Sequence, residues 1–112
     1  MNSALLRQVE QTIQQQQKLI ALGESLERLK NNQDFRKLIM EGYFVDEAVR
    51  LVHLKADPGF QSVDAQKSID LQILSVGSLS QYLNVVRATA EMASKTVADC
   101  ELTREELLQE GA

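Results

Sequence analysis

Apolar residues between positions 4 and 30 recur every three or four residues, the spacing that places side chains on one face of an α-helix. No proline interrupts this stretch. The pattern predicts one long helix over about 4–30. Because the apolar face shifts by one residue partway along this helix, the helix is expected to pack within its own chain or in a short contact between copies. One run is Leu6, Val9, Ile13, Gln16 and Ile20, in which Gln16 is the one polar residue, and the other, offset by one residue, is Leu19, Leu22, Leu26 and Leu29.

A seven-residue repeat runs through 62–100 and is the strongest periodic signal in the chain. Sustained heptads predict a long helix that packs against another helix. Gly77 could break it, since glycine costs about 1 kcal/mol relative to alanine in a helix, but we expect the helix to continue. Nine of the ten core positions are apolar: Ile69, Val76, Leu83, Ala90 and Val97, with Leu79, Val86, Ala93 and Cys100, the tenth being Gln72.

A shorter helix is predicted to follow the first long one. Asn32 or Asp34 can cap it, because a short oxygen-bearing side chain accepts hydrogen bonds from the free N–H groups of a first turn. Gly42 is expected to end it, since glycine commonly forms the left-handed residue at a helix end. Tyr43 and Phe44 would then lie in a connection.

A third helix is expected to begin at Asp46-Glu47, where acidic side chains suit the positive end of the helix dipole. It should stop by Asp57, because the residue before a proline disfavours the α region. Asp57-Pro58-Gly59 therefore indicates a turn that leads into the second long helix.

The C-terminal residues predict a further short helix. Thr103 and Glu106 have the spacing of a capping box, in which each side chain satisfies a backbone N–H of the first turn. Leu102 and Leu107 occupy the positions of the accompanying hydrophobic contact. We expect 103–110 to form either a lid on the bundle or a small acidic docking helix.

Together these patterns predict an all-α helical bundle within a single domain over 1–112. Its two long helices, at about 4–30 and 62–100, are expected to pair antiparallel, with 32–57 packed against them. Two long apolar seams exceed what one thin layer of helices can cover. The excess indicates a homo-oligomer or a partner helix.

The composition fits a globular chain: 44% of its 112 residues are hydrophobic and 25% are charged. One cysteine and one histidine can form neither an internal disulfide nor a structural zinc site. No apolar run approaches the roughly 20 residues that span a bilayer, and the start lacks the pattern of a signal peptide. We therefore expect a cytoplasmic protein without a membrane partner.

The net charge of −4 has the wrong sign for a surface that coats nucleic acid. A local basic excess leaves one nucleic-acid alternative open, with binding that should fall steeply with salt. The C-terminal segment from 91 to 112 is acidic and could dock on a basic surface. The basic residues are Arg28, Lys30, Arg36 and Lys37.

Nothing in the sequence indicates catalysis. Its five glycines are isolated, so no phosphate-binding loop is present. Adjacent acids such as Glu105 and Glu106 point in different directions on a helix and form no carboxylate pair. Cys100 lies between Asp99 and Glu101, and neighbouring acids disfavour a reactive thiolate. We expect no enzyme activity, no cofactor, no metal and no small-molecule substrate.

The segment 32–58 resembles small all-helical proteins encoded among the genes of tailed bacteriophages. The resemblance lies in the run Asp34 to Ile39, then Glu41 to Phe44, then Asp46 to Val52. It implies a phage accessory or virion-assembly protein that is expressed in the bacterial cytoplasm and can associate with the virion. It implies no role for any single residue.

The leading functional hypothesis is a non-enzymatic interaction protein that associates with itself or with another protein through apolar helix seams. The alternative is a small regulatory adaptor that binds a host protein through the 43–44 connection or the acidic C-terminus. The candidate interface residues are Leu79, Leu83 and Val86, then Leu19, Leu22 and Leu26, and for the adaptor Tyr43 and Phe44.

Overall fold

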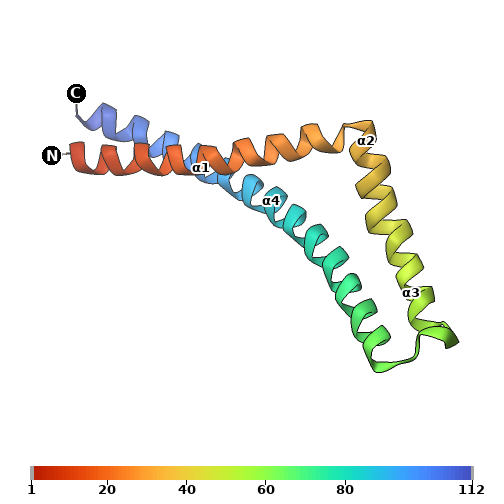
Figure 1. Ribbon diagram of the computed structural model, residues 1–112. Helices are drawn as coiled ribbons and strands as arrows, with labels where there is room; N and C mark the ends of the chain where they lie inside the picture. Colours follow the sequence, from red (N-terminus) through yellow and green to blue (C-terminus); the bar gives the residue numbers. More distant parts are fainter. Residues whose placement is uncertain (1, 112) are drawn as a thin grey trace. The chain divides into compact units, whose positions relative to one another are not determined.

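The computed structural model describes residues 2–111 and is helical over 94% of the chain. No strand occurs within the described range, which confirms the all-α prediction with two long helices (Figure 1). In order, the elements are α1 (Ser3–Lys30), α2 (Gln33–Phe35), the π-helix η1 (Arg36–Glu47), α3 (Ala48–Ala56), the 3₁₀ turn η2 (Pro58–Phe60) and α4 (Val63–Glu110).

The chain divides into two compact units. The first combines the described parts of 1–27 and 85–112, and the second is 28–84. The single-domain organisation over 1–112 stays a prediction.

The first unit is an antiparallel pair formed by α1 and the last part of α4. The ends of the two helices meet where the Asn2 side chain donates a hydrogen bond of 3.4 Å to Glu110 (Figure 1). Further along, Gly23 lies against Ala90. These two contacts fix the register of the antiparallel pair, whose direction the sequence predicted. The buried side chains of this pair are Ile13, Leu26, Val86, Ala93 and Val97.

The closest approach of the pair depends on Gly23. A Cβ placed on this residue would overlap the Cβ of Ala90. Only a glycine opposite an alanine lets the two backbones come this near. Gly23 itself is buried although it has no side chain.

The end of α4 corrects the sequence analysis. The helix continues to Glu110, ten residues beyond the expected end, so 103–110 is its last part and not a separate docking helix. The Thr103 hydroxyl donates to the carbonyl of Asp99 at 3.1 Å, one turn earlier, and does not cap a new helix. A threonine inside a continuous helix can satisfy its hydroxyl in this way, and no break in α4 precedes Thr103.

The second unit is built around a helical hairpin formed by α3 and the first part of α4. Its core consists of Leu51, Ile69 and Val76, of which Leu51 is only 1% exposed. Ile69 and Val76 are heptad positions, so the predicted repeat supplies the side of α4 that faces the core. α4 continues through Gly77, which confirms the expected continuous helix.

Residues 33–56 form one uninterrupted helical run through α2, η1 and α3. The Asn32 side chain caps it by accepting from the Phe35 N–H at 2.9 Å, so Asn32 is the cap of the two predicted candidates, and Asp34 lies inside α2. The predicted stop at Gly42 is wrong, because the helix continues through this residue and no described glycine has positive φ. The predicted Tyr43-Phe44 connection is also wrong, because both residues lie inside the π-helix.

The π winding also changes which side chains face inward. Its hydrogen bonds reach from residue i to i+5, so a turn holds more residues than the 3.6 of an α-helix. Phe35, Ile39 and Tyr43 are half-buried, whereas Leu38 is 72% exposed. An α-helix would place Leu38 on the same face as Phe35 and Ile39, and the π winding does not. A Cβ on Gly42 would meet a backbone carbonyl of the preceding turn at 2.8 Å.

Candidate interaction surface

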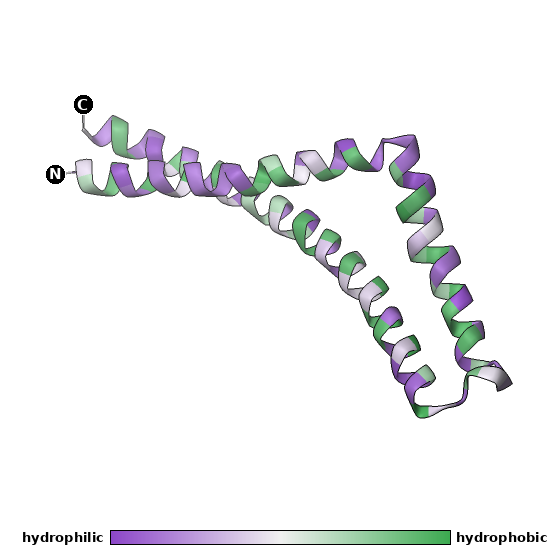
Figure 2. Cartoon of the chain, in the orientation of Figure 1, coloured by the Kyte–Doolittle hydropathy of each residue, from purple (hydrophilic) through white to green (hydrophobic). Residues whose placement is uncertain are grey.

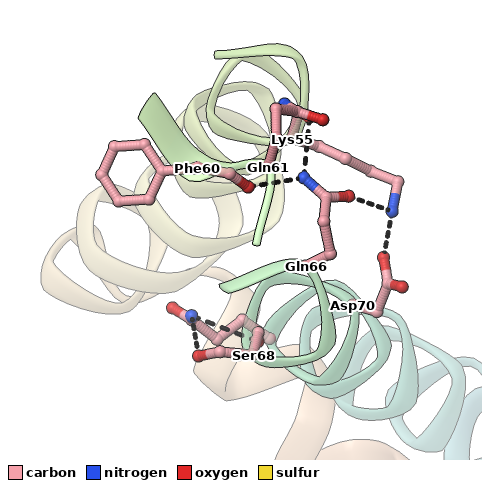
Figure 3. Close-up of polar contacts among 7 residues, drawn as sticks. Lys55, Phe60, Gln61, Gln66, Ser68 and Asp70 are labelled. Atoms are coloured by element: carbon pink, nitrogen blue, oxygen red, sulfur yellow. Dashed lines mark hydrogen bonds and ion pairs between the residues drawn. The ribbon is translucent and has the colours of Figure 1, made fainter. Parts of the chain in front are cut away.

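Polar contacts around the turn between α3 and α4 hold the hairpin together (Figure 3). The Gln66 side chain donates to the carbonyls of Lys55 at 3.0 Å and Phe60 at 2.8 Å. Lys55 in turn contacts the carboxylate of Asp70 at 2.5 Å. These bonds tie the end of α3 to the first turns of α4, and Ser62 caps α4 by accepting from the Ala65 N–H.

One face of α4 in this second unit is apolar and exposed. Leu71, Leu74 and Tyr82 are 65%, 64% and 57% exposed, and Leu79 is 37% exposed. Ser75 and Ser78 lie between them and are also exposed. At 3.6 residues per turn, all six positions share one side of the helix. We call this set the α4 stripe: Leu71, Leu74, Ser75, Ser78, Leu79 and Tyr82.

The α4 stripe lies within the longest part of α4 that has no charge. Between Asp70 and Arg87 all sixteen residues are uncharged. Figure 2 shows hydrophobic bands recurring along this part of α4. Exposed helix faces ordinarily carry charged side chains. An uncharged face with exposed leucines is therefore typical of a surface that another molecule covers.

A shallow hollow borders the α4 stripe where α4 packs against η1 and α3. Its volume is about 240 Å³. Ser75 belongs both to the α4 stripe and to the rim of this hollow. The rings of Tyr43 and Phe44 form a tilted pair with centroids 6.0 Å apart. The hollow is lined by Tyr43, Glu47 and Leu51 on one side and by Gln72, Ser75 and Val76 on the other.

A second apolar face lies on the outer side of η1 and α3. Val45, Val49 and Val52 are all more than half exposed and lie one turn apart. Charged side chains flank them, including an ion pair between Glu47 and Arg50 at 2.5 Å. This face is shorter than the α4 stripe and more polar at its edges. It is the weaker candidate for an apolar contact.

The basic residues do not form a purely cationic site. Arg36 and Lys37 line an open hollow of about 470 Å³, but Glu41 lines the same hollow. A carboxylate in such a place weakens the attraction for phosphate groups. Arg28 is exposed near the end of α1, and Lys30 is half-buried. The nucleic-acid alternative gains no geometric support from this arrangement.

The structure distributes the predicted interface residues among several environments. Leu26 and Val86 belong to the core of the α1–α4 pair, so neither offers an exposed contact. Leu22 is exposed on α1, whereas Leu19 and Leu83 are half-buried. Only Leu79 joins the α4 stripe. Tyr43 and Phe44 are half-buried within η1.

Of the large residues in the α4 stripe, only Leu79 was among the predicted interface residues. Leu71, Leu74 and Tyr82 fall outside the heptad positions, so a search for the strongest period passes over them. The signal that could have found them is the absence of charge over 71–86.

Within residues 2–111, no cluster of His, Cys, Asp or Glu side chains has the grouping to hold a metal ion. None of the helices in this range is long and apolar enough to cross a membrane. No protein-family model, curated protein or solved structure matches the chain. The geometry of the second unit is therefore the main guide to function.

Proposed function

We propose that this protein is a non-enzymatic helical interaction protein that associates with itself through the α4 stripe. One observation carries the proposal: six neighbouring positions of α4 stay exposed in a segment without charge. A lone exposed leucine is ordinary on a protein surface. A contiguous apolar face on one helix is not, because it leaves a favourable burial term unused.

The free energy gained by burying the side chains of the α4 stripe is large enough to favour association. Burying an exposed leucine side chain stabilises by about 1.5–3 kcal/mol. Leu71, Leu74 and Tyr82 each expose more than half of their surface, and a pair of copies buries each of them twice. Against this, association costs roughly 4–15 kcal/mol in lost freedom. The two terms are comparable, so we expect a dimer that dissociates on dilution.

The solution mass tests the proposal directly. Light scattering on a sizing column should give a mass that rises with concentration from 12.6 kDa toward twice that value. Leu74→Lys places a charge in the α4 stripe and should keep the protein monomeric. Leu38→Lys is the matched control, because Leu38 is similarly exposed but lies on η1. Circular dichroism confirms that each variant keeps its helix content.

Two results would contradict the proposal. One is a wild-type mass of 12.6 kDa at every concentration. The other is a dimer that survives Leu74→Lys and is lost in Leu38→Lys. A strict monomer would favour the adaptor alternative, with a foreign partner at Tyr43, Phe44 or the acidic C-terminus. A role in phage virion assembly is a more specific form of the proposal, and it rests on the resemblance of 32–58 alone.

A further inference from the structure

We infer that the α4 stripes of two copies pack antiparallel about a two-fold axis that lies between the two α4 helices, level with the point between Val76 and Gly77. This inference rests on the proposed function and specifies its geometry. The second copy is the occupant, and no other chain is required to complete the surface.

Large side chains are arranged symmetrically along the α4 stripe. Counted from the point between Val76 and Gly77, large residues lie at equal distances on both sides: Leu71 matches Tyr82, and Leu74 matches Leu79. A two-fold axis at this point therefore brings Leu71 level with Tyr82 of the second copy. Self-complementarity of this kind is what an isologous interface needs, since the same patch must fit itself.

The residues at the centre of the α4 stripe are small. Ser75 and Ser78 lie nearest the axis, where two helices approach most closely, and small side chains allow that approach. The Ser75 hydroxyl already donates to the carbonyl of Leu71 at 2.9 Å. Its donor group is thus satisfied inside the helix, and covering it leaves no unpaired N–H or O–H. Leu74 and Leu79 then cover the two sides of the contact.

Charge decides the direction of the two helices. No charged residue lies between Asp70 and Arg87, so a copy placed on the α4 stripe meets no charge there. In a parallel pair, Lys67 of one copy would lie level with Lys67 of the other at the edge of the contact. The antiparallel pair separates these like charges, and it also opposes the two helix dipoles.

The length of the α4 stripe sets the strength of the contact. From Leu71 to Tyr82 the helix rises about 17 Å. An interface this short buries less than the roughly 800 Å² per partner of a standard stable complex. The inferred dimer is therefore small and reversible, in agreement with the concentration dependence expected above.

Disulfide trapping tests the direction of packing. The experiment uses the full chain with Cys100→Ala, so that each variant carries one cysteine. In the antiparallel pair, Leu71→Cys lies opposite Tyr82→Cys, whereas two copies of either variant place their sulfurs about 17 Å apart. A disulfide needs Cβ atoms within about 4.5 Å. The mixture of the two variants should give several-fold more cross-linked dimer than either variant alone.

Gly77→Cys is the matched control. Gly77 lies almost level with the axis but points about 130° away from the centre of the α4 stripe. Nothing lies within 4 Å of a Cβ at this position, so the variant should fold. If random collision caused cross-linking, this variant would react as readily as the mixture. We expect it to remain a monomer after oxidation.

The possible outcomes separate the inference from the proposed function. Cross-linking of Leu71→Cys alone, without a gain in the mixture, would mean parallel packing and would overturn the inference. An absence of cross-linking while the solution mass still rises would place the contact on another face, with the same consequence. A protein that is monomeric at every concentration would overturn both. Sedimentation of each variant before oxidation confirms that the substitutions preserve association.

Discussion

Adding one methyl group at Gly23 should destabilise the antiparallel pair of α1 and α4. In an open helix, Gly→Ala stabilises by about 1 kcal/mol, because alanine is the better helix former. At Gly23 the new Cβ would overlap the Cβ of Ala90, so the helices must separate. Overpacking of this kind costs typically 1–3 kcal/mol. We expect Gly23→Ala to lower the free energy of unfolding by up to about 2 kcal/mol.

Gly77 provides the matched control, since the same substitution there meets nothing within 4 Å. Gly77→Ala should therefore raise stability by about 1 kcal/mol. The helix-propensity term is common to both variants, so their difference isolates the cost of the overlap. Urea denaturation followed by circular dichroism measures both values. Equal stabilisation by the two substitutions would refute the close approach of α1 and α4.

A double variant sharpens the same test. Gly23→Ala with Ala90→Gly moves the methyl group from one helix to the other and removes the overlap. Residues in contact show non-additive effects of 0.5–3 kcal/mol. The double variant should therefore be more stable than the sum of its single changes implies. Strict additivity would show that residues 23 and 90 do not touch.

Four further substitutions, one of them a control, probe other parts of the fold. Leu51→Ala should lower the free energy of unfolding by about 2–5 kcal/mol because Leu51 is fully buried, while the exposed Val52→Ala should change it by less than about 0.5 kcal/mol. Asn32→Ala should cost about 1 kcal/mol through loss of the cap on the Phe35 N–H, and a chemical melt that shows no loss would contradict that role. Gly42→Ala should destabilise, because its Cβ would lie 2.8 Å from a carbonyl of the π-helix; stabilisation of about 1 kcal/mol in a thermal melt would instead indicate ordinary α-helical winding.

The π-helix shows where local sequence rules fail. The sequence of 36–47 contains a glycine followed by two aromatic residues, and such a pattern commonly marks a helix end. The structure instead widens the helix so that Phe35, Ile39 and Tyr43 can face inward together. That choice depends on the surface that α4 offers, since Tyr43 lines a hollow with Gln72, Ser75 and Val76. Residue propensities within the segment contain no information about that surface.

The sequence by itself determined the all-α class, the two long helices, a cap at Asn32 or Asp34 and the heptad positions of α4. These features depend on neighbours within one or two turns, and local spacing records them faithfully. The end of α4 is an exception, since the capping-box spacing at Thr103 also permits an uninterrupted helix.

Only the tertiary structure decided which apolar residues are covered. Leu79 and Val86 are both heptad positions, yet Val86 is buried against α1 whereas Leu79 stays exposed. Leu71 and Leu74 lie outside the repeat and are more exposed still. Periodicity identifies a face, but burial depends on whether another helix reaches that face. Contacts such as Gly23 with Ala90 join residues far apart in the chain, and the folded backbone alone brings them together.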